Sequence, residues 1–257
     1  MNEEKILINK LETNYKTAGS GPAVLILHGW GGSSDSWLKV QENLSKNGYK
    51  VIVPDLPGFG KSKPPLEVWS VSDYAKWVLI FCGALNLDKF FLVSHSFGGR
   101  IAIKFTVTYP GKIKSLILCD SAGIKPRLDL KGMIIFQFAR IGNAIFSPKP
   151  LARFKDMVRS FFYVFLRNKD YSRAKGIMRE IIKKVLEEDL LPELTKIDIS
   201  TLIIWGEKDK LVPLKNAYVI KEMIKGSKLE ILPKIGHSPH LEVPEKLSEI
   251  ILNFLKQ

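Results

Sequence analysis

The sequence predicts an α/β protein with a doubly wound, mostly parallel sheet and one inserted helical segment. Short apolar runs alternate with longer segments of helical pattern, as where residues 23–27 precede residues 34–46. Strands of a parallel sheet are buried on both faces, and continuous apolar runs are typical of them. Glycine-rich or polar loops directly follow several of the runs. The alternation stops at residue 122 and resumes after residue 194, which indicates an insertion.

The length of 257 residues, of which 46% are hydrophobic, suits one globular domain with an insertion. We predict that residues 1–121 and 195–257 form the α/β core, and that residues 122–194 form a helical cap. The first ten residues are polar and charged, so we expect no signal peptide. Cys82 and Cys119 lie in apolar surroundings and are predicted to be reduced core residues, which favours a cytoplasmic location.

The net charge of +13 raises the question of an acidic partner. The basic residues are scattered rather than gathered in runs, and no signature of a nucleic-acid-binding module is present. We therefore expect no nucleic-acid partner. We favour a solvated basic surface over contact with a membrane surface.

The first half of the chain predicts an edge hairpin followed by alternating strands and helices. Turn signals such as Gly48 and Pro110 separate these elements. The hairpin strands are expected at 6–11 and 13–17, and the later strands at 23–27, 51–53, 90–93 and 113–118. Helices are expected at 34–46 and 72–85, and a third, with the apolar pattern Ile101, Ala102 and Phe105, ends near Pro110.

The second half contains the insertion and then returns to the alternating pattern. Apolar and aromatic clusters at 133–138 and 161–166 have helical spacing. The segment from 122 to 194 holds fifteen Lys or Arg against eight Asp or Glu. Strands are then expected at 201–205 and 229–232, and helices at 214–224 and 244–255, the last with a proline at its start.

Ser96 lies in a short turn between a predicted strand and a predicted helix. The residues two before and two after it, Ser94 and Gly98, are small, although Ser94 stands where glycine is usual. This arrangement is typical of a nucleophile elbow, in which a sharp turn lifts a serine above the edge of the sheet. The alternative is that Ser96 only caps the following helix.

A serine hydroxyl is a weak nucleophile that needs a neighbouring base, and the base needs a partner that orients it. Asp209 follows the predicted strand at 201–205, and His237 follows the one at 229–232. Because the carboxyl ends of parallel strands share one edge of the sheet, we expect Ser96, Asp209 and His237 to meet there.

The sequence resembles the α/β-hydrolase superfamily over nearly its whole length. The resemblance rests on several motifs in the correct order: His28-Gly29, the loop 55–62, the elbow 94–99, Trp205-Gly206 with Asp209, and Gly236-His237. It implies that Ser96 attacks an acyl carbonyl, that His237 moves the proton and that Asp209 orients His237. It also implies an oxyanion hole formed by the backbone N–H groups of Trp30 and Phe97, without a metal or cofactor.

Other residues compete for some of these roles. Asp120 also ends a predicted strand, but the pattern Gly206-x-x-Asp favours Asp209 as the acid. His240 lies close to His237 in the sequence, and His95 precedes Ser96; both are expected to pack near the site rather than to transfer protons. His28 is expected mainly to order the oxyanion loop.

The substrate is expected to lie under the cap. Candidate substrate-binding residues are His28, Leu211 and the cap aromatics Phe138, Phe161 and Phe162. The same aromatics could instead pack the cap onto the core. A small or medium carboxylic ester, or a lactone, is the default substrate.

Three other functions stay open at this point. One is a carbon–carbon bond hydrolase of the meta-ring-fission type, although Ser238 stands where those enzymes usually carry tryptophan. Another is a ligand-sensing protein on a hydrolase fold. The third is a peripheral lipase whose basic, aromatic cap contacts anionic lipid.

Overall fold

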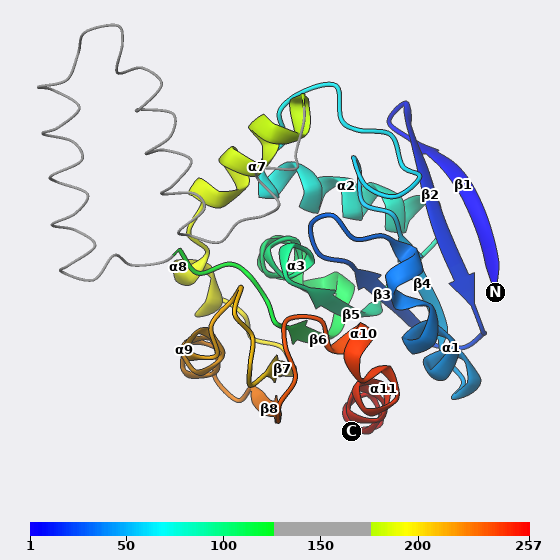
Figure 1. Cartoon of the computed structure of the whole chain (residues 1–257). Helices are drawn as coiled ribbons and strands as arrows, with labels where there is room; N and C mark the ends of the chain where they lie inside the picture. The colour runs from blue at the N-terminus through cyan, green and yellow to red at the C-terminus, as the bar shows by residue number, and fades with distance from the viewer. Residues whose placement is uncertain (126–175) are drawn as a thin grey trace, which may run out of the picture.

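The computed structural model describes residues 1–125 and 176–257 (Figure 1). It confirms the predicted α/β class. An eight-stranded sheet has the order β1-β2-β4-β3-β5-β6-β7-β8. The strands are β1 (Asn2–Ile8), β2 (Leu11–Ala18), β3 (Ala23–Leu27), β4 (Lys50–Pro54), β5 (Phe90–His95), β6 (Ile113–Cys119), β7 (Thr201–Gly206) and β8 (Lys228–Leu232). Among the strands that the structure describes, only the pairs β1–β2 and β2–β4 are antiparallel.

The helices cover both faces of the sheet (Figure 1). They are α1 (Leu38–Lys46), α2 (Val71–Ala84), α3 (Phe97–Thr108), α7 (Ile177–Glu187), α8 (Leu191–Leu194), α9 (Lys215–Met223), α10 (Pro239–Glu242) and α11 (Pro244–Leu255). Short 3-10 turns precede α1 at Ser34–Trp37 and β6 at Pro110–Lys112. Residues of α1 and α11 pack on one face of the sheet, and residues of α2, α3 and α9 pack on the other.

The alternation of side chains along β3 explains why all of its residues are apolar. Val24 and Ile26 belong to the core under α1 and α11, whereas Leu25 and Leu27 belong to the core under α2 and α3. Successive side chains of a strand point to opposite faces, so both sets are buried only if every residue is apolar. All four residues are fully buried.

The predicted boundaries of the first hairpin were wrong. Leu11 does not end the first strand but begins β2, where it pairs with Ile8. The turn consists of Asn9 and Lys10, with φ angles of 50° and 68°. Two-residue hairpin turns of this kind require positive φ at both positions, which asparagine adopts readily. The predicted loop after β8 likewise contains the short helix α10 from Pro239 onward.

The predicted cap falls largely on residues outside the described ranges. The clusters at 133–138 and 161–166 lie there, and so do Phe138, Phe161 and Phe162. The described flanks, 122–125 and 176–194, contain α7 and α8 but no strand. Arg100 of α3 donates hydrogen bonds to the carbonyls of Val185 (3.0 Å) and Glu188 (2.9 Å), so the end of α7 is attached to the core. The domain boundaries stay a prediction.

Cys82 and Cys119 are free thiols in the core, as predicted. Across the described ranges, the structure holds no helix with the length and apolar character of a membrane span. The cytoplasmic location stays a prediction.

Candidate active site

Ser96 connects β5 to α3 in a sharp turn, with φ 49° and ψ −111°. Such a backbone conformation costs about 1–3 kcal/mol in a residue with a side chain, and neighbouring contacts must hold it. The N–H of Ser96 donates to the carbonyl of Cys119 (3.2 Å). Its own carbonyl accepts from the N–H groups of Gly99 (2.9 Å) and Ala122 (3.1 Å). Cys119 at the end of the neighbouring strand β6 and Ala122 in the loop after it therefore hold the elbow in place.

The small residues predicted around Ser96 are required by close backbone contacts. A Cβ on Gly98 would lie 2.3 Å from the carbonyl oxygen of Leu27, at the end of β3. Ser94 is fully buried, and its hydroxyl donates to the carbonyl of Ile117 across the sheet (3.1 Å). This hydrogen bond explains how serine replaces the usual glycine at position 94.

Gly98→Ala is expected to destabilise the fold by about 1–3 kcal/mol, the range for overpacking. The neighbouring atom is backbone and does not move aside as a flexible side chain would. Urea unfolding followed by circular dichroism measures the change. The matched control is Gly83→Ala in α2, where a Cβ meets nothing within 4 Å; it is expected to stabilise the helix by about 0.5–1 kcal/mol. An unchanged midpoint for Gly98→Ala would contradict the crowding argument.

The structure brings Ser96, His237 and Asp209 into one chain of hydrogen bonds. His237 Nδ1 lies 2.7 Å from Asp209 Oδ2, and His237 Nε2 lies 3.0 Å from Ser96 Oγ. A carboxylate only accepts, so Nδ1 donates and Nε2 presents its lone pair to the serine hydroxyl. The side chain of His237 is 15% exposed, and that of Asp209 is fully buried. This is the geometry of a serine activated by a general base.

Asp209 is itself held in place by backbone. Its Oδ1 accepts from the N–H groups of Leu211 (2.7 Å) and Val212 (3.0 Å), which leaves Oδ2 for His237. Leu211 is half-exposed and its N–H serves the acid, while its contact with substrate stays a prediction. Asp120 makes no hydrogen bond to His237; its Oδ1 accepts from the N–H of Gly206 (2.9 Å). The acid that reaches His237 is therefore Asp209.

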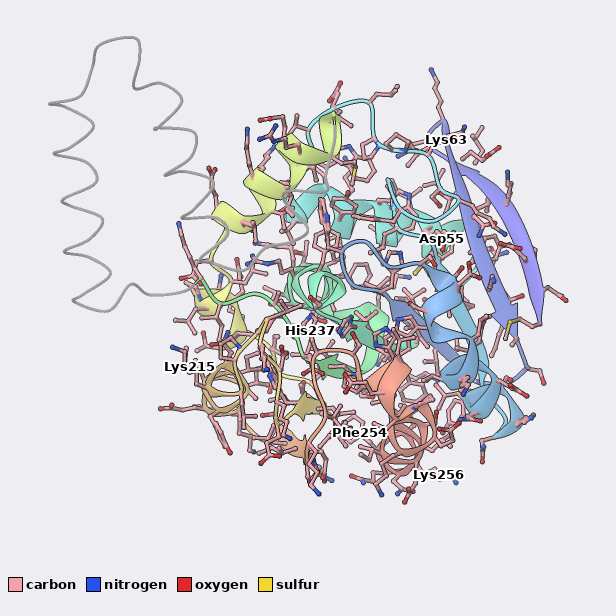
Figure 2. The ribbon with its side chains drawn as sticks, viewed as in Figure 1. Asp55, Lys63, Lys215, His237, Phe254 and Lys256 are labelled. Carbon is pink, nitrogen blue, oxygen red and sulfur yellow. The ribbon has the colours of Figure 1, made fainter. Side chains whose placement is uncertain are left out.

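The backbone of His237 is fixed by two side chains. Glu242 in α10 accepts from the N–H groups of Gly236 (2.9 Å) and Ser238 (3.2 Å). His95 Nε2 donates to the carbonyl of His237 (2.6 Å). Sequence reasoning missed Glu242, because its role depends on α10 turning its carboxylate back toward the loop. Figure 2 labels His237 near the middle of the molecule, beside α3.

His95 and His240 lie behind His237 and are buried. The ring of His95 lies 4.8 Å from that of His237 and 4.5 Å from that of His240, and His240 stacks on Trp37. Burial lowers the pKa of His240 to about 3, and burial also lowers the pKa of His95 well below its ordinary value. Both rings are therefore neutral and do not compete with His237 for the proton of Ser96.

His28 joins two loops and is also neutral. Its Nδ1 donates to the carbonyl of Gly29 (2.7 Å), and its Nε2 accepts from the N–H of Leu56 (2.9 Å). Burial lowers the pKa of His28 to about 4. With both ring nitrogens occupied, His28 orders the loops after β3 and β4 and offers no nitrogen to a substrate.

These neutral histidines predict a stability that falls in acid. The unfolded chain binds a proton on each histidine near pH 6.5, whereas folded His28 and His240 do so only near pH 4 and pH 3. The unfolded state thus binds more protons in this window, and the free energy of unfolding falls by up to about 1.4 kcal/mol per pH unit for each group as pH decreases.

Urea unfolding between about pH 7 and pH 4 tests this expectation. His240→Phe keeps a ring against Trp37 but cannot titrate, so its stability should fall less steeply with acid than that of the wild type. Equal slopes in both proteins would show that folded His240 is not held neutral.

The predicted oxyanion donors lie beside the elbow. A Cβ on Gly29 would lie 2.7 Å from His95 Nδ1 and 3.2 Å from Ser96 Cβ, so the loop after β3 touches the nucleophile turn. The ring of Trp30 packs edge-on against those of Phe97 (5.1 Å) and Phe59 (4.8 Å). Within the part of the chain that the structure describes, the N–H groups of Trp30 and Phe97 donate to no acceptor. Both remain available to a substrate oxygen.

Asp55 orders the loop after β4 (Figure 2). Its carboxylate accepts from the N–H groups of Ser34 (2.6 Å) and Lys61 (2.8 Å) and from the side-chain amide of Asn14 (3.0 Å). Three segments that are distant in the sequence meet at this group. Phe59, which packs on Trp30, lies in the same loop.

Comparison with known proteins gives matches over most of the chain. The family described as alpha/beta hydrolase fold matches residues 22–244. The 2-hydroxy-6-oxo-6-(2'-aminophenyl)hexa-2,4-dienoic acid hydrolase of Metapseudomonas resinovorans is 29% identical, with 96% of this chain and 88% of that protein covered. Monoacylglycerol lipase ABHD6 of Mus musculus is also 29% identical, with 92% and 76% covered. The solved structure of a serine hydrolase involved in carbazole degradation has a TM-score of 0.75 and 26% identity, with 99% of this chain and 98% of that chain covered.

Proposed function

Because the chain belongs to the α/β-hydrolase fold family, we propose that it is a serine hydrolase that cleaves a carboxylic ester through Ser96, His237 and Asp209. The observation that carries the proposal is the directed chain of hydrogen bonds from Asp209 Oδ2 through His237 to Ser96 Oγ. The strained elbow supports it, since backbone strain of this kind is typical of functional sites.

The first half of the reaction acylates the enzyme. Ser96 Oγ attacks the carbonyl carbon while its proton passes to His237 Nε2, and the carbonyl electron pair moves onto oxygen. The N–H groups of Trp30 and Phe97 bind that oxyanion, and each such donor is worth about 3–4 kcal/mol in the transition state. The tetrahedral adduct then expels the alcohol oxygen, which takes the proton from His237.

The second half releases the acid. Water attacks the acyl carbon, gives one proton to His237 Nε2 and forms a second oxyanion at the same two N–H groups. When this adduct collapses, the bond to Ser96 Oγ breaks and the serine recovers its proton from His237. Asp209 stabilises the imidazolium in both halves, since its Oδ2 lies 2.7 Å from Nδ1.

We propose a small or medium acyl ester, or a lactone, as the substrate. The rings of Trp30, Phe59 and Phe97 form an apolar cluster beside the oxyanion donors, of which Trp30 is partly exposed, and such surroundings suit an acyl chain better than a charged group. Similarity to a monoacylglycerol lipase supports an ester. Phe138, Phe161 and Phe162 stay proposed contacts of the acyl chain, and they lie outside the described residues.

Hydrolysis of a series of p-nitrophenyl esters from short to long acyl chains tests the proposal. A fluorophosphonate probe, which reacts with activated serines, tests the nucleophile without a guess at the substrate. We expect turnover of at least one ester and labelling of Ser96. Labelling with negligible turnover would instead indicate a ligand-sensing protein. No labelling and no turnover would exclude a serine hydrolase.

A second candidate is a hydrolase of carbon–carbon bonds in ring-fission dienoic acids. The 29% identity to the hydrolase of Metapseudomonas resinovorans favours it. Ser238, next to His237, stands against it, because the resemblance described above places tryptophan there in such enzymes. The absorbance decay of a ring-fission dienoate measures this activity, and a higher kcat/KM for the dienoate than for every ester would make it the main function.

A further inference from the structure

Asp120 is a buried carboxyl group that the proposed mechanism does not use. It directly follows β6, is fully buried and has a positive φ of 42°. Its N–H donates to the carbonyl of Ile204 (3.0 Å), and its Oδ1 accepts from the N–H of Gly206 (2.9 Å). Both contacts are to β7, the strand whose following loop carries Asp209. The backbone thus fixes Asp120 against the base of that loop.

The carboxyl group of Asp120 lies beside the triad, within hydrogen-bond reach of the carboxyl group of Asp209. Across residues 1–125 and 176–257, no donor reaches the buried Oδ2. One carboxylate oxygen of Asp120, one of Asp209 and one ring nitrogen of His237 all lie within 4.8 Å of one another. Two ionised carboxylates only accept hydrogen bonds and repel each other in a buried place. The arrangement is favourable only if one of the two carries a proton.

The donors around the two carboxyl groups decide which one is protonated. Asp209 receives hydrogen bonds from Leu211, Val212 and His237, whereas among the described residues Asp120 receives a single one, from Gly206. Hydrogen bonds to a carboxylate favour its charged form. The charge therefore stays on Asp209 and the proton on Asp120.

We propose that Asp120 is protonated in the working enzyme and donates its O–H to the carboxylate of Asp209, as a positioning residue for the acid of the triad. The inference rests on the proposed role of Asp209 and adds a fourth member behind it. Burial, with the charges of Asp209 and Glu242, raises the pKa of Asp120 to about 9, which agrees with this protonation state.

This hydrogen bond has a consequence for catalysis at high pH. It helps to hold Asp209 with Oδ1 on its backbone donors and Oδ2 on His237. When Asp120 loses its proton, the donor disappears and a second negative charge lies beside the first. We therefore expect kcat to fall as pH rises through about 9.

Two substitutions separate the hydrogen bond from mere packing. In Asp120→Asn, the amide oxygen accepts from Gly206 and the NH₂ donates to Asp209, so the protonated acid is reproduced. Its kcat should stay close to that of the wild type near neutral pH and should lack the fall near pH 9. Asp120→Leu has no donor and should lower kcat about 10- to 100-fold, the range for losing a hydrogen bond to a charged group, with KM little changed.

The other titratable groups that face Asp120 are Asp209, His237, Glu242 and Cys119. All are retained in both variants, so a difference between the pH profiles of the wild type and Asp120→Asn reports Asp120 itself. If Asp120→Leu does not fold, the comparison with Asp120→Asn is sufficient.

Unfolding measurements test the proton without any catalysis. Folded wild type keeps a proton that the unfolded chain releases above about pH 4, so raising the pH favours unfolding of the wild type but not of Asp120→Asn. The ratio of their unfolding constants should therefore rise toward tenfold per pH unit between about pH 4 and pH 9 and then level off.

The possible failures are distinguishable. If ester hydrolysis survives Ser96→Ala unchanged, the proposed function is overturned, and the role of Asp120 in positioning a catalytic acid falls with it. If Ser96 is required, but Asp120→Asn loses as much activity as Asp209→Asn and the unfolding ratio is flat with pH, Asp120 is ionised in the folded enzyme. That result overturns the inference about Asp120 alone.

Discussion

Ser96→Ala is expected to lower kcat/KM for ester hydrolysis at least about a thousandfold. The substitution removes the only protein atom that forms a covalent bond to the acyl carbon in the proposed mechanism. The substitution leaves the oxyanion donors of Trp30 and Phe97 in place. The backbone at position 96 keeps its positive φ, so the fold should persist. Residual activity would come from the oxyanion hole and substrate binding. Initial rates with the best p-nitrophenyl ester measure the effect.

The matched control is Ser45→Ala. Ser45 lies in α1, beside the turn that precedes β3. Gly19 belongs to this turn, and a Cβ added to it would lie 2.8 Å from the Cβ of Ser45. This turn is at the edge of the sheet opposite to the triad loops. The control should be as active as the wild type, and both variants should show the same circular dichroism. Equal activity of Ser96→Ala and Ser45→Ala would remove Ser96 from the mechanism.

Asp209→Asn is expected to lower kcat by about 10³- to 10⁴-fold. The two backbone N–H groups of Leu211 and Val212 at Oδ1 fix the direction of the new amide, because they require its oxygen there. The NH₂ group then faces His237 Nδ1, which must accept instead of donate. This places the hydrogen of His237 on Nε2, where it points at Ser96 Oγ, so the ring can no longer take the serine proton.

The pH profile distinguishes this loss of tautomer from a loss of fold. Hydroxide can replace the missing base, so residual activity of Asp209→Asn should rise with pH beyond the range of the wild type. Asp88→Asn, at a side chain that is 97% exposed, is the control and should change nothing. An Asp209→Asn enzyme with full activity would show that another group, with Asp120 as the first candidate, orients His237.

Much of the architecture could be predicted, since local patterns encode it. The apolar run at 23–27 coincides with β3, and the helix predicted at 244–255 coincides with α11. Each is marked by residues within the element itself, namely a run buried on both faces and a proline at the first helical position. The strands of the first hairpin, by contrast, were misplaced, because Asn9 and Lys10 were not recognised as the residues of its turn. Both residues have positive φ.

The candidate site was partly predictable for a similar reason. Ser96, Asp209 and His237 each follow a strand, and parallel strands bring their carboxyl ends to one edge, so order along the chain was enough to group them. This rule does not distinguish Asp209 from Asp120, because each of them follows a strand and the two strands are neighbours. A hydrogen bond of 2.7 Å to His237 Nδ1 is what separates them.

The sequence by itself determined the class of the fold, the order of its elements and the three residues at strand ends that make up the candidate triad. The tertiary structure decided how Glu242 and His95 hold the backbone of His237, how His28 joins two loops, and that Asp120 faces Asp209. The physical reason is the distance along the chain between the residues that interact. Strands and helices arise from patterns of a few neighbouring residues, whereas a hydrogen bond between distant segments depends on register and on distances of a few tenths of an ångström.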